Sequence, residues 1–165
     1  MQKDSVDRMI ETWAETHPEL DVGPLDVAGR LLLCAHHLER RLVEALQPLG
    51  LTFADFDVLN TLRRRAEPAG TNPSDLAESA LITTGAMTTR LHRLEAAGFI
   101  KKVADPDDGR AVRVSLTPRG RTIAQRALTK VLAADEDFLT PLTATQRHQT
   151  ASALRQLLVH TEENL

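Results

Sequence analysis

Threonine hydroxyls and a guanidinium recur along one side of the segment 84–97, a pattern suited to binding phosphates. On a helix that turns by about 100° per residue, Thr88, Thr89 and Arg93 fall together on one side. The opposite, apolar side consists of Met87, Leu91 and Leu94. Hydroxyl and guanidinium groups bind DNA phosphates and base edges. The pattern therefore predicts a helix that enters the major groove of DNA, and the alternative is an ordinary solvated surface helix.

A second basic feature follows, in a predicted β-hairpin. Two short segments with strand character, 99–103 and 111–116, flank a turn rich in Asp, Pro and Gly. Arg110 lies at the end of this turn, where a long cation can enter a minor groove. The alternative is that Arg110 pairs with Asp105 or Asp108 and only shapes the loop. The basic residues of the flanking strands favour DNA contact.

The elements around these residues have the order of a winged helix-turn-helix. Asn72-Pro73 is typical of a helix start, and the helix that follows is short. A tight connection, the longer helix over 84–97 and the hairpin complete the unit, whose second helix reads the major groove. The predicted DNA-binding residues are Ser74, Thr83, Thr84, Thr88, Thr89, Arg93 and Arg110.

The charge is distributed unevenly along the chain. The net charge is −3, which by itself argues against a DNA-binding protein. Residues 81–130, however, carry 10 basic and 4 acidic side chains, a balance of +6, and the segments on both sides are acidic. The basic segment coincides with the predicted winged unit, so double-stranded DNA is the expected partner.

Composition excludes several classes of protein. Hydrophobic residues make up 42% of the chain, which is enough for a core, whereas aromatics make up only 3%, few for a single-strand stacking surface. Cys34 is the only cysteine, no apolar run is long enough for a membrane span, and the N-terminus does not resemble a signal peptide. These features predict a cytoplasmic protein. Metal, nucleophile and phosphate-loop motifs are missing, so we expect neither an enzyme nor a cofactor.

Amphipathic helices are predicted on both sides of the winged unit. The N-terminal ones cover 4–16, which Asp4 can cap, and 25–46, whose apolar stripe is wide enough to predict burial on more than one side. Two further helices start at Thr117-Pro118 and at Thr143, the second with a capping box, and another capping box at Thr52-Phe53-Ala54-Asp55 starts a helix within the winged unit. We therefore predict a mainly α fold with a small β-hairpin wing. The expected parts are 1–50, 51–120 and 121–165, of which the outer two carry dimerisation helices.

The chain resembles the MarR family of dimeric winged-helix regulators over nearly its whole length. The matching stretches are 72–80, 82–99 (ITTGAMTTRLHRLEAAGF) and 105–120 (DPDDGRAVRVSLTPRG). The Asp-x-x-Asp-x-Arg wing of the family corresponds to Asp105, Asp108 and Arg110. The resemblance implies a homodimer that binds a pseudo-palindromic operator.

The N-terminal extension is similar to that of the urate-responsive branch of this family (VDRMIETWAETHPELDVGPLDV, 6–27). This resemblance implies a ligand site that includes Trp13, Asp57 and Arg90. A second arginine of the branch is Lys102 here, which keeps a cation but loses the bidentate guanidinium fork. The implied function is repression released by a small anionic ligand such as urate, a purine or an organic acid.

Helix geometry supports part of this ligand site. Arg90 lies about 60° from the core direction of its helix and therefore not on the outer side that would face DNA. This direction suits a cleft at the boundary between the core and the surface. The alternative for Arg90 is a salt bridge to Asp55 or Asp57, and the alternative for Trp13 is a plain hydrophobic anchor.

Two other regulators are compatible with the sequence. The first is switched by oxidation of Cys34, although this thiol lies in the apolar stretch 31–35 and is expected to be hidden. The second binds DNA constitutively and has no effector.

Overall fold

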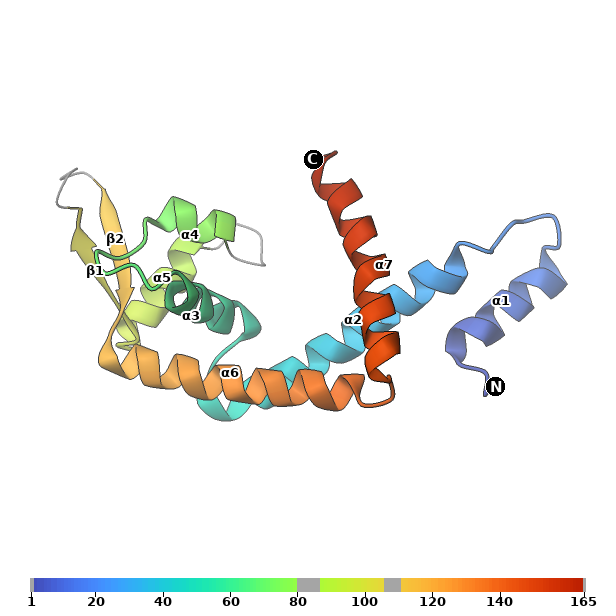
Figure 1. Ribbon diagram of the computed structural model, residues 1–165, viewed down its shortest axis with the longest axis horizontal. Coiled ribbons are helices and arrows are strands. Elements are labelled where there is room, and N and C mark those ends of the chain that lie inside the picture. The colour runs from blue at the N-terminus through green and yellow to red at the C-terminus, as the bar shows by residue number, and fades with distance from the viewer. Residues whose placement is uncertain (1, 80–86, 106–110, 165) are drawn as a thin grey trace. The chain divides into compact units, whose positions relative to one another are not determined.

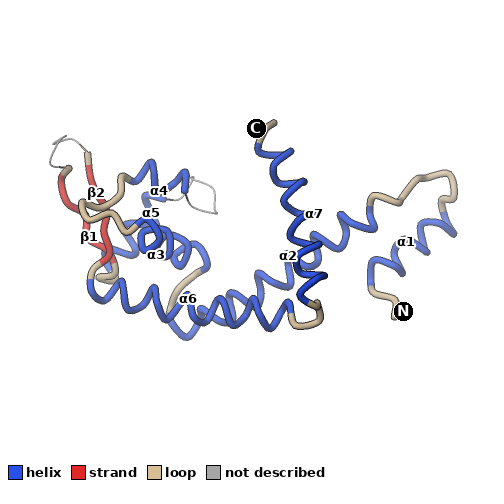
Figure 2. Tube along the Cα trace, in the orientation of Figure 1, coloured by secondary structure: helices blue, strands red, loops and turns tan. Residues whose placement is uncertain are grey.

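The computed structural model describes residues 2–79, 87–105 and 111–164. The chain is mostly helical with one antiparallel β-hairpin, which confirms the predicted fold class (Figures 1 and 2). It divides into two compact units, Met1–Val43 and Glu44–Leu165.

The first unit contains helix α1 (Ser5–Thr16) and most of helix α2 (Leu25–Leu46). Asp4 caps α1 through a capping box with Asp7, which confirms the predicted start. Arg30 of α2 donates from Nε to Asp4 (2.9 Å) and from Nη2 to Asp7 (2.6 Å). Buried Val6 packs near Gly29, because a Cβ on that glycine would lie 3.2 Å from the valine side chain. These contacts hold α1 against α2.

The second unit begins with the end of α2 and a 3-10 turn (Gln47–Leu49). Its further elements are α3 (Phe53–Arg65), α4 (Pro73–Ser79), α5 (Met87–Ala96), β1 (Ile100–Ala104), β2 (Val112–Leu116), α6 (Pro118–Leu139) and α7 (Ala144–Glu162). Thr52, Thr117 and Thr143 accept the capping hydrogen bonds of α3, α6 and α7, as the sequence predicts. The chain's local signals therefore place these helix starts correctly.

The winged part of this unit is built around α3. The hairpin pairs Ile100 with Leu116 and Ala104 with Val112, and a bridge from Thr71 to Val114 adds a third short segment. Helix α3 packs against α6, β2, α4 and α5. Fully buried side chains at the centre are Leu59, Leu76, Leu94 and Val114. The apolar side of α5 packs against this core.

Two expectations about α2 are wrong for the single chain. Leu32 is 74% exposed and Leu31, Leu33 and Val43 are also exposed, so the helix is not buried on more than one side. Cys34 is exposed rather than hidden. The physical reason is that an apolar stripe predicts burial but does not specify whether the covering surface belongs to the same chain.

Gly120 is predicted to be essential for the junction between the hairpin and α6. A Cβ at this position would overlap the carbonyl oxygen of Phe99. We expect Gly120→Ala to lower the free energy of unfolding by about 3 kcal/mol, the upper part of the range for overpacking. Urea unfolding followed by circular dichroism measures this change. Thr122→Ala on the exposed side of α6 is the control and should change stability by less than about 0.5 kcal/mol. Equal stability of the two variants would contradict the prediction.

Candidate nucleic-acid interface

Helix α5 separates an apolar side from a polar side. Met87, Leu91 and Leu94 are buried, whereas Thr88 and Thr89 are exposed. This arrangement confirms the angular prediction for the helix. Exposed hydroxyls on a rigidly supported helix are suited to contacts with phosphates and base edges.

Arg93 is also exposed, but one of its nitrogens has a protein partner. Its Nη2 pairs with Oδ2 of Asp55, a carboxylate that is only 1% exposed, whereas the Arg93 side chain is 52% exposed. The same Oδ2 accepts hydrogen bonds from the Thr52 backbone nitrogen (2.7 Å) and hydroxyl (2.6 Å). A single oxygen thus joins the capping box of α3 to the exposed side of α5.

This ion pair was not predicted from the sequence. The sequence analysis gave Asp55 or Asp57 as partners for Arg90, and the structure pairs Asp55 with Arg93, nearly one helical turn further along. The available signal was the capping box, since it fixes the Asp55 carboxylate at the start of α3.

Of the other predicted DNA-binding residues, the structure describes only Ser74. Ser74 is exposed in the first turn of α4, where its backbone nitrogen donates to Oδ1 of Asn72 (2.9 Å). Thr83, Thr84 and Arg110 lie outside the described residues. The complete set of DNA-binding residues stays a prediction.

Arg113 organises the base of the wing. Its Nε donates to Oδ2 of Asp105 at 2.7 Å, and its Nη1 donates to the carbonyl of Gly70 at 3.2 Å. Asp105 is 8% exposed, so this is a largely buried charge-assisted contact. The sequence placed Arg113 only among the basic residues near the hairpin. The structure shows that it links the wing to the loop before α4.

The predicted ligand residues occupy different environments. Asp57 is buried on α3, Arg90 is partly buried on α5, and Lys102 on β1 pairs with Glu95 at 2.8 Å. The hydrogen bond from Lys102 lowers the pKa of Glu95. Trp13 is 39% exposed, and its ring centroid lies 5.4 Å from that of His17. Trp13 belongs to the first unit and the other three residues to the second, so their joint site stays a prediction.

Two other features are absent from the described part of the chain. Its His, Cys, Asp and Glu residues form no group of three that could hold a metal ion. Its helices include none with the length and apolarity required to cross a membrane.

Comparison with known proteins identifies the family of this chain. A model of the MarR family matches residues 49–111. The transcriptional regulator PecS of Dickeya dadantii is 31% identical over 160 residues, which cover 97% of this chain and 94% of PecS. The chain belongs to the MarR family. It therefore shares the winged-helix architecture of these transcriptional regulators.

Solved members of the MarR family share the fold. A mutant of Escherichia coli MarR in complex with operator DNA is 29% identical, with a TM-score of 0.72 over 84% of this chain and 99% of that one. The transcriptional repressor Rv2887 of Mycobacterium tuberculosis is 40% identical over 113 residues, 68% of this chain and 79% of Rv2887. Its complex with salicylic acid has a TM-score of 0.59 over 84% of this chain and 96% of that one, at 36% identity.

Proposed function

We propose that this MarR-family protein is a homodimeric repressor that binds a pseudo-palindromic operator and releases it when a small organic anion binds. The observation that carries the proposal is α5, whose apolar side is packed in the core while Thr88, Thr89 and Arg93 are exposed. The DNA complex of E. coli MarR and the repressor Rv2887 support this function by similarity. Cytoplasmic location and lack of enzymatic activity belong to the same proposal.

The dimer is supported by apolar surface that the single chain leaves open. Large hydrophobic side chains are exposed along α2 and α7, and they include Val27, Leu31, Leu32, Leu33, Val43, Leu154, Leu157, Leu158 and Val159. Monomeric soluble proteins rarely expose so many apolar residues on two helices. We infer that a second copy covers these helices, which places two winged units on one operator.

The wing is expected to contribute to DNA affinity through charge. The logarithm of the binding constant should fall with the logarithm of salt concentration by about 0.9 per neutralised phosphate. Arg110→Ala should therefore flatten this slope by about 1 in each protomer and weaken binding on most sequences. Fluorescence anisotropy with labelled operator at several salt concentrations measures both effects. Unchanged affinity and slope would remove the wing from the mechanism.

The proposed ligand site combines Trp13, Asp57, Arg90 and Lys102. The complex of Rv2887 with salicylic acid supports an organic acid as the class of ligand. We expect urate or salicylate to change the emission of Trp13, the only tryptophan, and to release operator DNA over the same range of concentration. Arg90→Gln should weaken this response by roughly tenfold or more, because it removes a charge-assisted hydrogen bond. Absorbance-corrected fluorescence titration measures the response.

Three controls make this experiment specific. Lys102→Arg restores the guanidinium fork and should tighten urate binding. Trp13→Phe should remove the optical signal and shift release of the operator to higher ligand concentration without abolishing it, because Phe keeps an aromatic ring in the proposed site. A regulator switched by oxidation of Cys34, which is exposed in the single chain, is the second candidate, and Cys34→Ser should leave release by the anions intact. If neither acid releases the operator while peroxide does so only when Cys34 is present, the ligand hypothesis is wrong.

A further inference from the structure

The end of α5 is closed by backbone hydrogen bonds around a glycine. Gly98 has a φ of +71°, the left-handed conformation that commonly ends a helix. Its backbone nitrogen donates to the carbonyl of Glu95 at 2.8 Å, and that of Phe99 donates to the carbonyl of Leu94 at 2.9 Å. The carbonyl groups of Gly98 and Phe99 lie beyond this last turn and take their donors from another segment of the chain.

Both carbonyls accept hydrogen bonds from Thr117, the residue that caps α6. Its hydroxyl donates to the carbonyl of Gly98 at 2.7 Å and lies 3.2 Å from that of Phe99, to which its backbone nitrogen donates at 3.0 Å. The same hydroxyl accepts the capping bond of α6 from the backbone nitrogen of Gly120 at 2.9 Å. A hydroxyl donates one proton and accepts through two lone pairs. Thr117 therefore uses its donor for the end of α5 and an acceptor for the start of α6.

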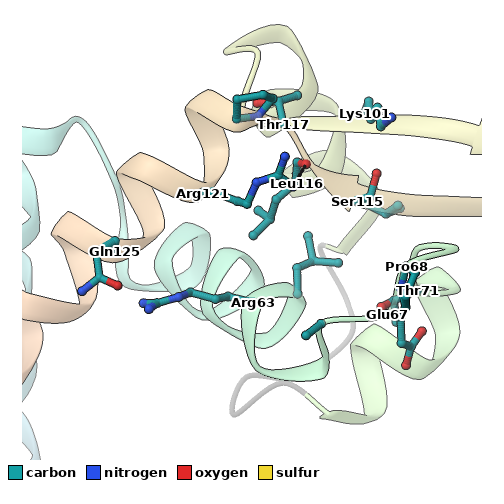
Figure 3. A pocket seen from close by; sticks show the side chains of 14 residues that line it. Arg63, Glu67, Pro68, Thr71, Lys101, Ser115, Leu116, Thr117, Arg121 and Gln125 are labelled. Carbon is teal, nitrogen blue, oxygen red and sulfur yellow. Dashed lines mark hydrogen bonds between the residues drawn. The ribbon is translucent and has the colours of Figure 1, made fainter.

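Other residues in the first turn of α6 contact the same end of α5. The guanidinium carbon of Arg119 lies 5.1 Å from the centroid of the Phe99 ring, a cation–π contact. Gly120 approaches the Phe99 carbonyl so closely that a Cβ would overlap it. Figure 3 shows Thr117 where β2 ends and α6 begins. Three residues at the start of α6 thus contact the two residues that follow α5.

We propose that Thr117 is a positioning residue for the DNA interface, because its hydroxyl fixes the end of α5 to the start of α6. The apolar side of α5 is buried, but burial of apolar surface is non-directional and allows a helix to turn or slide. A hydrogen bond has a preferred direction and restricts such movement. The bond from Thr117 therefore sets the direction of the exposed side, which carries Thr88, Thr89 and Arg93. This inference rests on the proposed function, since it concerns the same interface.

Thr117→Asp separates the two roles of the hydroxyl. A carboxylate caps a helix well but has no proton to donate at neutral pH, so this variant keeps the bond from Gly120 and loses the bond to Gly98. We expect amide hydrogen exchange at Gly98 and Phe99, followed by NMR in the full-length protein, to become roughly tenfold faster, while Gly120 stays protected.

DNA binding is measured by fluorescence anisotropy on a labelled duplex that the wild-type protein selects from a random-sequence pool. Thr117→Asp should weaken binding of this duplex roughly tenfold, because the exposed side of α5 is no longer held in one direction. Thr117→Ser keeps both the donor and the acceptor. This variant should therefore show wild-type hydrogen exchange and wild-type affinity.

Thr122→Asp is the matched control for the added negative charge. Thr122 is exposed in the second turn of α6, and this variant should keep wild-type exchange and affinity. If Thr117→Asp is poorly folded, Thr117→Val provides the test, since valine keeps the shape of threonine and removes the hydroxyl. It should speed exchange at Gly98 and Phe99 and weaken DNA binding at least as strongly.

Two results would overturn the positioning role. One is wild-type hydrogen exchange at Gly98 and Phe99 in the folded variant, and the other is faster exchange with unchanged affinity for the duplex. Failure of the proposed function gives a different result, because the wild-type protein would then select no duplex from the pool.

Discussion

Asp55→Ala is expected to destabilise the protein and to disorganise the exposed side of α5, which we propose binds DNA. The substitution removes the capping box of α3, which costs about 1 kcal/mol. It also removes the contacts of this carboxylate with the Thr52 hydroxyl and with Arg93, and hydrogen bonds to charged groups are worth about 1.5–3 kcal/mol. We expect a total loss of about 3 kcal/mol in the free energy of unfolding, measured by urea denaturation.

Conservative variants separate the charge of Asp55 from its capping role. Asp55→Asn keeps an oxygen that can accept from Thr52 but loses the ion pair to Arg93. We expect only about 1 kcal/mol of destabilisation, together with roughly tenfold weaker operator binding because Arg93 is no longer held in position. Adding Arg93→Gln to Asp55→Asn should then cause little further loss, since coupled residues are non-additive. Fully additive effects on affinity would show that Arg93 acts independently of Asp55.

Leu158→Glu is expected to separate the proposed dimer into monomers. Leu158 is 59% exposed on α7, next to the exposed Leu157 and Val159. A charge buried in a dimer interface without a partner is strongly unfavourable. Because linked binding modules gain about 10²–10⁴ in avidity, operator affinity should fall by a factor in this range. Sedimentation velocity at micromolar protein and an operator titration measure the two effects.

Gln156→Glu is the matched control for charge and helix propensity. It introduces the same residue into α7, two positions away and therefore on another side of the helix. We expect this variant to remain dimeric and to bind operator normally. If Leu158→Glu is poorly folded, Leu158→Ala provides the milder test. The dimer of this variant should dissociate at a higher protein concentration than the wild-type dimer does. A fully dimeric Leu158→Glu variant would exclude α7 from the interface.

Local patterns in the sequence were sufficient for the elements that carry the proposed function. Capping boxes at Thr52 and Thr143 and the Thr117-Pro118 start predicted three helices whose caps the structure confirms. Periodicity alone identified the buried side of α5. Such signals are reliable because the donor and acceptor of a cap lie within one helical turn, and the faces of a helix follow from its pitch.

Contacts between distant segments were beyond the reach of these patterns. The sequence offered Asp55 or Asp57 to Arg90, whereas the structure pairs Asp55 with Arg93. Asp105, one of the two acids offered to Arg110, pairs with Arg113, and Arg110 itself lies outside the described residues. Several arginines were within plausible reach of each acid. The choice among them depends on the packing of α3, α5 and the hairpin, which sequence spacing does not specify.

The sequence by itself determined the order of the elements, the helix starts, the polar side of α5 and the resemblance to winged-helix regulators. Only the tertiary structure decided which charges are already paired and that Cys34 is exposed in the single chain. The physical reason is the distance along the sequence between the residues that interact. Caps and helix faces arise from residues a few positions apart, whereas burial and ion pairing depend on which surfaces the folded core brings together.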